Sequence, residues 1–552
     1  MSSFFSKKLA PILPHPLTLL SSLLLVICFP PWNLWPCIWV CLIPWFWVLK
    51  NAPHQKAALR EGFWLGYGMT LGGFYWVAYA LQEYGNLPWP ISVLGLLLFC
   101  CVGQLQFVGI SGVLFHRLRA PNSPLHLSLG LAFFYTGLDW VLPKIFADTL
   151  GHCFYQAPYF RQLADLTTAY GLTFLAFFMN LTLFEWAMRL TQKRKFQFHA
   201  PAVISLLLCL SAWIYGSIRA PQLKREINAA TSSIQLAAIQ ANIGDLQKLA
   251  AERNLADAAL DVMDRFTRLS EQALQSKPSP QAILWPETSY PAIFGQPTTE
   301  LESILNAQVE RIVQKYQVPL WFGGYDRMNH QDFNSFFFLE PQGALHRYHK
   351  NRILLFGEYI PGSEWFPLLR EAFPQVGNFG RGPGPQVFSL QVPGRNEPLR
   401  VAPTICYEGL FTDFLVQASR MGGELILNIT NDSWFGPTSE PHLHLALTVF
   451  RAIETHLPLL RSTNTGISAL ITADGEITSP TNLGTEAILS IRIPLTRALG
   501  SLVKQWGDWF GPFSLIIGLL LNLSTGFPSV QTPDTWLTRA WMSLGRGKLK
   551  KS

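Results

Sequence analysis

Long apolar runs with almost no charge limit most strongly what this chain can fold into. Hydrophobic residues make up 49% of the sequence and charged residues only 14%, below the usual charged share of about 25%. The deficit lies between Leu9 and Ile218, whereas charges are evenly spread from Pro221 to Gln505. Because a helix needs about 20 apolar residues to cross a bilayer, the sequence predicts a membrane half followed by a water-soluble half.

Eight runs are candidate transmembrane helices: 10–28, 35–49, 62–82, 91–115, 126–143, 171–190, 200–218 and 508–524. Seven of them in succession argue against buried helices of a large soluble protein. The first run has no clear small-residue cleavage site after it, so a cleaved signal peptide is not favoured. We therefore expect a transmembrane domain of seven helices over 1–220, a soluble domain over 221–505, and a final transmembrane helix with a basic cytoplasmic tail over 506–552.

The positive charges between these runs predict the orientation, because Lys and Arg collect in short cytoplasmic loops. They cluster before run one, in every second loop, and after run eight: Lys7, Lys8, Lys50, Lys56, Arg60, Arg117, Arg119, Lys193, Arg194, Lys195, Arg546, Lys548, Lys550 and Lys551. An odd number of runs precedes the soluble region, so we expect that region on the outer side. These basic residues explain the net charge of +7. The sequence has no basic patch interleaved with aromatic residues, so it does not predict nucleic-acid binding.

The soluble region shows the pattern of an α/β layered domain. Branched or aromatic runs predict strands at 233–240, 281–285, 319–324, 335–339, 399–405, 424–429 and 466–472. Helical patterns lie at 247–275, 300–315, 409–420 and 439–456. Buried strands that alternate with helices are typical of layered α/β folds, and the Gly/Pro-rich stretch 376–387 predicts a loop.

Cys406, in "VAPTICYEGL", is the only cysteine after Cys209. Outside the cytoplasm a lone thiol is either buried and inert or kept free for chemistry. Cys406 ends a predicted strand and a helix is expected from Glu408, so the helix N-terminus would lower the pKa of the thiol. Glu287 follows another strand, where ligand crevices form in α/β domains, and "RYHKNRILLFGEYIP" supplies Lys350.

These three residues are a candidate base, cation and nucleophile, but each also has a structural interpretation. Glu287 alone could be a surface carboxylate, Lys350 a solvated charge, and Cys406 a core residue. His442 and His444 lie two residues apart, on different faces of a helix, and no Cys or carboxylate cluster joins them in the sequence. We therefore expect no metal and no cofactor.

Five motifs occur together and in order: "WPET", "YHKNRILLFGEYIP", "ICYEGLF", "NITNDSWFG" and "RAIETHLPLLRSTNTGISA". With them the soluble half resembles the nitrilase superfamily, and the whole chain resembles the apolipoprotein N-acyltransferase family of the bacterial inner membrane. The resemblance implies a multi-span helical domain of about eight transmembrane helices and an α-β-β-α sandwich. It also implies Glu287 as base, Lys350 as oxyanion stabiliser and Cys406 as nucleophile.

The same resemblance implies supporting roles for Glu358 and Glu408, and it places Trp434 near a lipid entrance. The backbone N–H of Tyr407 is a candidate second oxyanion donor. Apolar neighbours of the site would exclude water and favour an amine over water as acceptor; the candidates are Phe356, Tyr359, Trp434 and Phe435. Residues 144–170 depart from the family pattern, so no lipid contact is carried over to them.

The implied reaction transfers an acyl chain from a phospholipid to the N-terminal amine of a diacylglyceryl-cysteine apolipoprotein, through a thioester on Cys406. We expect a monomer that spans the inner membrane several times, with its catalytic domain on the periplasmic side among membrane lipids. Two alternatives stay open. One is a membrane-anchored amidase, nitrilase or lipid hydrolase with the same three residues, and the other is a lipid-binding scaffold without activity.

Overall fold

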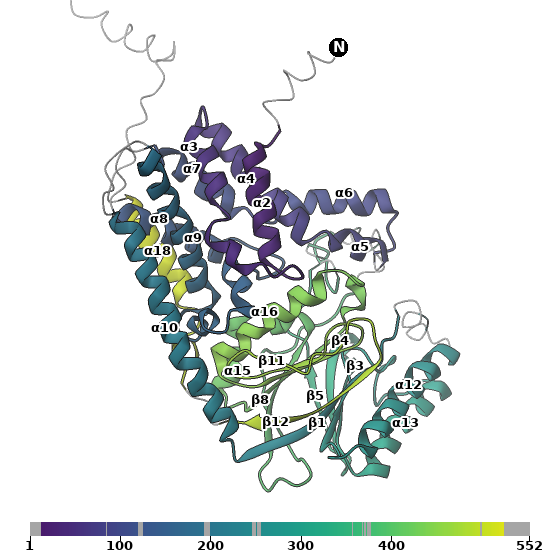
Figure 1. The fold of residues 1–552 in the computed structure, drawn as a ribbon. Helices are drawn as coiled ribbons and strands as arrows, with labels where there is room; N and C mark the ends of the chain where they lie inside the picture. Colours follow the sequence, from purple (N-terminus) through teal and green to yellow (C-terminus); the bar gives the residue numbers. More distant parts are fainter. Residues whose placement is uncertain are drawn as a thin grey trace, which may run out of the picture.

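The computed structural model describes residues 13–83, 85–119, 125–191, 199–244, 250, 256–355, 357–360, 362–366, 368, 371, 377–496 and 500–523. A helical half lies against a β-rich half, and the long helix α10 (Ala200–Asn228) leads from the first into strand β1 (Figure 1). Phe356 and the basic residues at 7–8, 193–195 and 546–551 lie outside the described residues.

Two six-stranded sheets form the β-rich half. The first has the order β12-β1-β2-β3-β4-β5, with β1 Ser232–Gln240, β2 Ala282–Leu284, β3 Leu320–Met328, β4 Gln331–Leu339, β5 Leu345–His349 and β12 Ala487–Leu495. The second has the order β11-β10-β9-β8-β7-β6, with β6 Phe388–Leu390, β7 Leu399–Ile405, β8 Leu425–Thr430, β9 Leu459–Thr463, β10 Ala469–Ile471 and β11 Ile477–Thr478. The central strands β1–β2–β3 and β7–β8–β9 are parallel.

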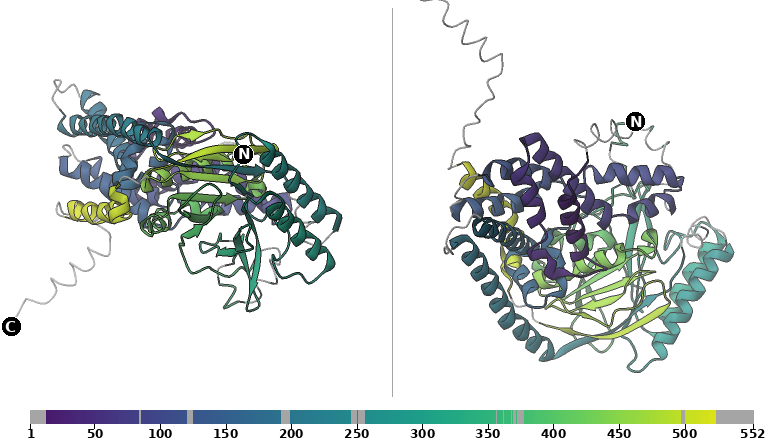
Figure 2. Two further views of the ribbon diagram at one scale, coloured as in Figure 1. Left: turned by 90° about the horizontal axis from the view of Figure 1, so that it is seen from below. Right: turned by 45° about the horizontal axis from the view of Figure 1, so that its top comes forward.

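Helices cover the outer face of each sheet. Helices α12 (Ala256–Gln275) and α13 (Glu300–Tyr316) pack on the first sheet through Phe266 and Val309, on the side away from the helical half (Figure 2). Helices α15 (Thr412–Arg420) and α16 (Glu440–Thr455) cover the second sheet. Between the sheets, Trp321 shares a core with Leu427 and Leu460. The predicted α-β-β-α sandwich is therefore confirmed.

The helical half contains, besides α10, the segments α2 Pro16–Cys28, η1 Trp35–Trp39, α3 Ile43–Asn51, α4 Gln55–Gly73, α5 Trp76–Glu83, α6 Trp89–Cys100, α7 Gln106–Arg117, α8 Leu125–Val141, η2 Leu150–Gln156, η3 Phe160–Leu163, α9 Ala164–Thr191, α17 Leu502–Trp506 and α18 Phe510–Leu523. Helix α18 returns to pack along α8 (Figure 1). A Cβ on Gly137 would lie 2.3 Å from Leu515 Cα, so the missing side chain lets these helices approach closely.

Within the described residues, two helical segments are long and apolar enough to cross a membrane: Phe160–Thr191 and Ala200–Asn228. Three apolar helices are shorter: Pro16–Cys28, Trp89–Cys100 and Phe510–Leu523. The expected eight continuous spans are not confirmed, because several runs are broken. Run 91–115 divides into α6 and α7, run 62–82 divides after Gly72 and Gly73, and run 35–49 divides before Pro44. Glycine weakens a helix interior, and proline favours the first turn of a new helix.

Candidate active site

Glu287 lies just beyond the end of β2, at a point where the chain crosses the neighbouring strand β3. A Cβ on Gly323 of β3 would lie 2.6 Å from Glu287 Cα and 2.6 Å from the Pro286 carbonyl oxygen. Only glycine allows this close approach of two backbones. The crossing buries the Glu287 side chain, which is 5% exposed.

Lys350 follows β5 and brings a buried positive charge to Glu287. Its Nζ lies 3.2 Å from Glu287 Oε1 and 2.8 Å from Glu358 Oε1. Although burial lowers the pKa of Lys350, the charges of Glu287 and Glu358 raise it well above its usual value. The lysine therefore stays an ammonium ion, and the structure brings Glu287, 63 residues before it in the sequence, to Lys350 and Glu358.

Asn334 on β4 is a fourth member of this cluster, and sequence reasoning missed it. Its Nδ2 donates to Glu287 Oε1 at 2.8 Å and to Glu358 Oε1 at 2.9 Å. The available signal was a lone amide at the start of an aromatic strand, in "DFNSFFFL". The Asn431 N–H donates to the other oxygen of Glu287 at 2.9 Å, so both carboxylate oxygens of Glu287 are held.

Cys406 lies where β7 ends and a short 3₁₀ turn, η4 (Cys406–Leu410), begins. Its φ of 51° lies in the left-handed region, which is costly for a residue with a Cβ. Its side chain lies in the core between the two sheets, with only 8% of the residue exposed. The helix expected from Glu408 begins instead at Thr412, as α15.

The expected low pKa of the Cys406 thiol is wrong. Burial and the charge of Glu287 raise this pKa well above its usual value, and Lys350 only partly opposes them. A single 3₁₀ turn offers too few aligned peptide dipoles to outweigh burial. The resting thiol is therefore neutral and needs a base, and Glu287, whose charge acts on this thiol, is the candidate.

Glu408 ties the cysteine turn to the segment that carries Lys350. It is fully buried and accepts four hydrogen bonds, from Ile405 N at 2.8 Å, Tyr348 Oη at 2.7 Å, Asn351 N at 2.6 Å and Arg352 N at 3.1 Å. Because all four donors flank Cys406 or Lys350, Glu408 fixes the two reactive groups relative to each other.

The aromatic residues near the turn connect the site to the helical half. Tyr407 donates its hydroxyl to the Ile145 carbonyl, and Phe435 packs edge-on against Trp76 of α5 with ring centroids 5.0 Å apart. Trp434 lies against Gly357, where a Cβ would be 3.1 Å from the indole ring. Tyr359 is half-buried beneath Arg381.

Among the described residues, one group could hold a metal ion: Asp432, Glu440 and His444, whose ligand atoms lie within 4.8 Å of one another. Glu440 lies one helical turn before His444 in α16, and the fold adds the carboxylate of Asp432 from outside this helix. Arg461 Nη2 already lies 2.8 Å from Asp432 Oδ2. A guanidinium therefore compensates the charge of Asp432 in this buried polar network.

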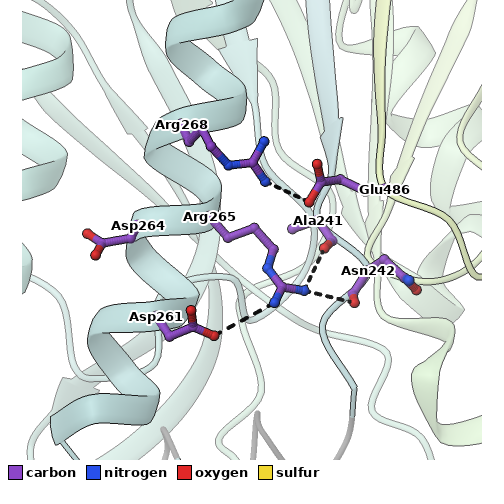
Figure 3. Close-up of a pocket in the computed structure, with 7 residues that line it drawn as sticks. All are labelled: Ala241, Asn242, Asp261, Asp264, Arg265, Arg268 and Glu486. Carbon is purple, nitrogen blue, oxygen red and sulfur yellow. Dashed lines mark hydrogen bonds and ion pairs between the residues drawn. The ribbon is translucent and has the colours of Figure 1, made fainter.

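Two of the cavities bordered by described residues differ in their lining. One, of about 610 Å³, is bordered by Ala241, Asn242 and the ion pairs Arg265–Asp261 and Arg268–Glu486 (Figure 3). The other, of about 280 Å³, is mostly apolar and lies between α4, the α6–α7 connection and residues 143–148. Its lining includes Ile145 and Phe146, which both contact Tyr407. This apolar cavity therefore adjoins the cysteine turn, as does a cavity of about 330 Å³ that is bordered by Leu410 and Phe411.

Comparison with known proteins gives two family matches. Residues 21–182 match the apolipoprotein N-acyltransferase N-terminal domain, and residues 235–499 match carbon-nitrogen hydrolase. An apolipoprotein N-acyltransferase from Bdellovibrio bacteriovorus is 33% identical, over 87% of this chain and 88% of that protein. One from Geobacter metallireducens is 29% identical, over 90% and 92%.

A solved amidase of the nitrilase superfamily from Nesterenkonia AN1 is 16% identical and covers 47% of this chain and 90% of its own, with a TM-score of 0.35. That score is too low to establish a shared fold by itself. The sequence matches run through both halves of the chain, in the order that the structure shows.

Proposed function

Since this chain belongs to the apolipoprotein N-acyltransferase family and is an acyltransferase, we propose that it completes lipoprotein maturation through a thioester on Cys406. The acyl donor is a phospholipid, and the acceptor is the N-terminal amine of a diacylglyceryl-cysteine apolipoprotein. Covalent catalysis of this kind divides one acyl transfer into two easier steps.

In the first step the Cys406 sulfur attacks the ester carbonyl of the phospholipid. Glu287 takes the thiol proton as the S–C bond forms. When the ester C–O bond breaks, the same proton goes to the leaving alcohol oxygen, and a lysophospholipid departs. The ammonium of Lys350 and the backbone N–H of Tyr407 stabilise the oxyanion, and losing one such donor typically costs about 3 kcal/mol in the barrier.

In the second step the acceptor amine attacks the thioester carbonyl. Glu287 takes a proton from the amine nitrogen, the C–S bond breaks, and the proton returns to the sulfur of Cys406. The product is an amide, and the thiol is ready for another turnover.

The observation that carries this proposal is the buried Glu287–Lys350 pair, 3.2 Å apart, at a lone cysteine in a strained turn. The cluster adjoins the helical half through Tyr407 and lies next to an apolar cavity. Substrates that both reside in a bilayer need a site in this position.

The proposed placement is a multi-pass protein of the inner membrane with about eight transmembrane helices. Residues 1–220 and 506–552 form its membrane part, and 221–505 lie on the periplasmic side. Exposed large apolar side chains support it, since many lie on the outer surfaces of α10 and α18: Leu206, Leu207, Leu210, Trp213, Ile214, Ile218, Ile516, Leu519 and Leu520. A protein surface in contact with water rarely exposes so many large apolar side chains next to one another.

An amidase, nitrilase or lipid hydrolase with the same three residues is the alternative, and it differs only in using water as the acceptor. The scaffold hypothesis is set aside because the family is enzymatic. The neutral, buried thiol favours a site that excludes water, which is what a transferase needs.

Mass spectrometry of the purified protein after incubation with phospholipid tests the proposal. We expect an acyl adduct on the peptide that contains Cys406, and neither adduct nor turnover in Cys406→Ser, because a hydroxyl ionises far less readily than a thiol. Cys101→Ser, which changes an exposed thiol between α6 and α7, is the matched control and should keep both. Near-normal transfer by Cys406→Ser would overturn the thioester mechanism.

A further inference from the structure

Three buried polar side chains form a row across the second sheet, directly behind the cysteine turn. The register pairs Thr404 of β7 with Asn428 of β8, and Asn428 with Arg461 of β9. Leu427 and Leu460 pack between the two sheets, so Asn428 and Arg461, one position further along each strand, point to the opposite face. That face is the one covered by α16.

The row holds the backbone of Cys406. Asn428 Nδ2 donates to the Cys406 carbonyl oxygen at 3.2 Å and to Thr404 Oγ1 at 3.1 Å. Asn428 Oδ1 in turn accepts a hydrogen bond from Arg461 Nη1 at 2.9 Å. Thr430 Oγ1 donates to the same oxygen at 3.1 Å. The orientation of the amide, and through it the position of the Cys406 carbonyl, therefore depends on Arg461 together with Thr430.

The other end of the same guanidinium holds the turn that supports Glu287. Arg461 Nη2 donates to Asp432 Oδ2 at 2.8 Å, and a Cβ on Gly466 would lie 2.0 Å from that oxygen, so only glycine leaves room for it. Asp432 directly follows Asn431, whose N–H donates to Glu287 Oε2. One side chain thus connects the turn of the nucleophile with the turn of the base.

We propose that Arg461 is a positioning residue that sets the location of Cys406 relative to Glu287. This inference rests on the proposed function, which makes these two residues nucleophile and base. The guanidinium is planar and presents its donors in a fixed fork. Its two hydrogen bonds therefore fix how far Asn428 lies from Asp432, which a flexible ammonium does not do.

The geometry of Cys406 explains why such a constraint is needed. A residue with a Cβ at a φ of 51° is strained, and it persists only where its surroundings hold it. Asn428 provides one restraint and Glu408 another. Gly409 allows the turn to reach the amide, because a Cβ there would lie 3.0 Å from Asn428 Nδ2.

Glu440 gives a control within the same network. It is 1% exposed, and its Oε1 lies 3.5 Å from His444 Nδ1, but no hydrogen bond of its carboxylate is found among the described residues. Burial and the charge of Asp432 raise the pKa of Glu440 well above its usual value, so its side chain is neutral. Glu440→Gln, which keeps shape and charge, should leave the positions of Asn428 and Asp432 unchanged.

Two variants interrupt the connection at different points. Arg461→Lys keeps the charge and removes the fork. Asn428→Asp keeps a partner for Arg461 but removes the donor to the Cys406 carbonyl. Gel filtration and thermal unfolding first establish that each variant is folded. We then expect each variant to lower kcat at least about tenfold, with KM for both substrates within about twofold of the wild type. The reason is that a small displacement of Cys406 slows the chemical step more than it weakens binding. Glu440→Gln should match the wild type.

Alkylation of Cys406 by iodoacetamide, followed peptide by peptide across pH 6–10, gives a measurement that does not depend on acyl transfer. We expect both variants to alter the pH profile of Cys406 alkylation, with no change at Cys101. If Arg461→Lys does not fold, Asn428→Asp decides. Folded variants with wild-type profiles and wild-type kcat would overturn the positioning role. A wild-type protein that forms no acyl adduct would instead overturn the proposed function. The alkylation profiles would still test whether Arg461 positions Cys406.

Discussion

At the scale of single residues, the candidate site is a cluster of charges held by neutral amides. Sequence reasoning grouped Glu287, Lys350 and Glu358, and in the structure their side chains lie within hydrogen-bond distance. It could not find Asn334, because that contact depends on the pairing of β4 with β5, which no local pattern reveals. It also assigned a low pKa to Cys406, because burial of the thiol follows from tertiary packing.

Asn334→Ala should reduce acyl transfer about tenfold or more. The change removes one of the two donors that Glu287 and Glu358 share, the other being Lys350, and removing a hydrogen bond to a buried charged group costs roughly 1.5–3 kcal/mol. Steady-state kinetics of the purified variant measure the effect, with the exposed Asn396→Ala as control. Unchanged kinetics in Asn334→Ala would show that Lys350 and the backbone N–H groups of Asn431 and Leu354 position the two carboxylates without Asn334.

Glu454 should make the stability of the protein depend on pH. Burial raises the pKa of this carboxyl to about 8, against the pull of Arg451. Its folded pKa thus exceeds its unfolded value of 4.5. As the pH rises, Glu454 loses its proton at a lower pH in the unfolded chain than in the folded protein. The contribution of Glu454 to stability is therefore complete below pH 4.5 and is lost as the pH rises to about 8.

Thermal unfolding in detergent between pH 5 and pH 9 tests this expectation. The wild-type Tm should fall as the pH rises, by an amount that corresponds to a few kcal/mol at most. Glu454→Gln should have a flatter profile, and the exposed Glu397→Gln should keep the wild-type slope. Equal slopes in all three proteins would mean that Glu454 is ionised throughout.

At the scale of elements, the long buried strands and amphipathic helices of the sandwich were predictable, and the short or polar ones were not. Strands β1, β2, β7 and β8 lie within two residues of their predicted positions. Strands β6 and β11, of three and two residues, lie at the edges of the second sheet and are mostly not buried, so they lack the apolar run that marks the equally short but fully buried β2. Strand β9 contains the buried Arg461. From the sequence alone a charged residue argues against a buried strand, because the groups that compensate its charge are not visible there.

Gly323→Ala should lower activity with only a modest loss of stability. The added Cβ would lie 2.6 Å from Glu287 Cα, and the backbone that carries the base must shift to relieve the contact. The rate of acyl-adduct formation measures the effect, and we expect a fall of about 10²-fold for a shift near 1 Å. Gly244→Ala, where a Cβ meets nothing within 4 Å, should keep the wild-type rate; equal rates in the two variants would contradict the role given to Gly323.

At the scale of the whole molecule, composition predicts an apolar half followed by a more charged half, and in the structure a helical half precedes a β-rich half. The sequence could not show how they dock, because the shared apolar core joins residues far apart in the chain, and so do contacts such as Tyr407 with Ile145 and Phe435 with Trp76. The sequence-based prediction also overestimated the length of several helices, because hydropathy does not show the breaks in runs 62–82 and 91–115.

The orientation of the β-rich half is testable directly. A phosphatase that is active only outside the cytoplasm, inserted in the exposed loop at 276–279, should be active, because the basic loops predict an outward-facing domain. The same reporter fused after residue 552 should be inactive and controls for leakage. Activity only in the second fusion would reverse the orientation and remove both substrates from reach of Cys406.

The central claim is that Cys406 carries an acyl group which waits for an amine. The lifetime of the acyl-Cys406 adduct, measured by mass spectrometry with and without a peptide bearing a diacylglyceryl-modified N-terminal cysteine, tests it most directly. We predict a long-lived thioester in lipid alone and rapid discharge into the peptide amide when the acceptor is added, with ping-pong kinetics. Decay to free fatty acid at the same rate in both cases would identify a lipid hydrolase and contradict acyl transfer.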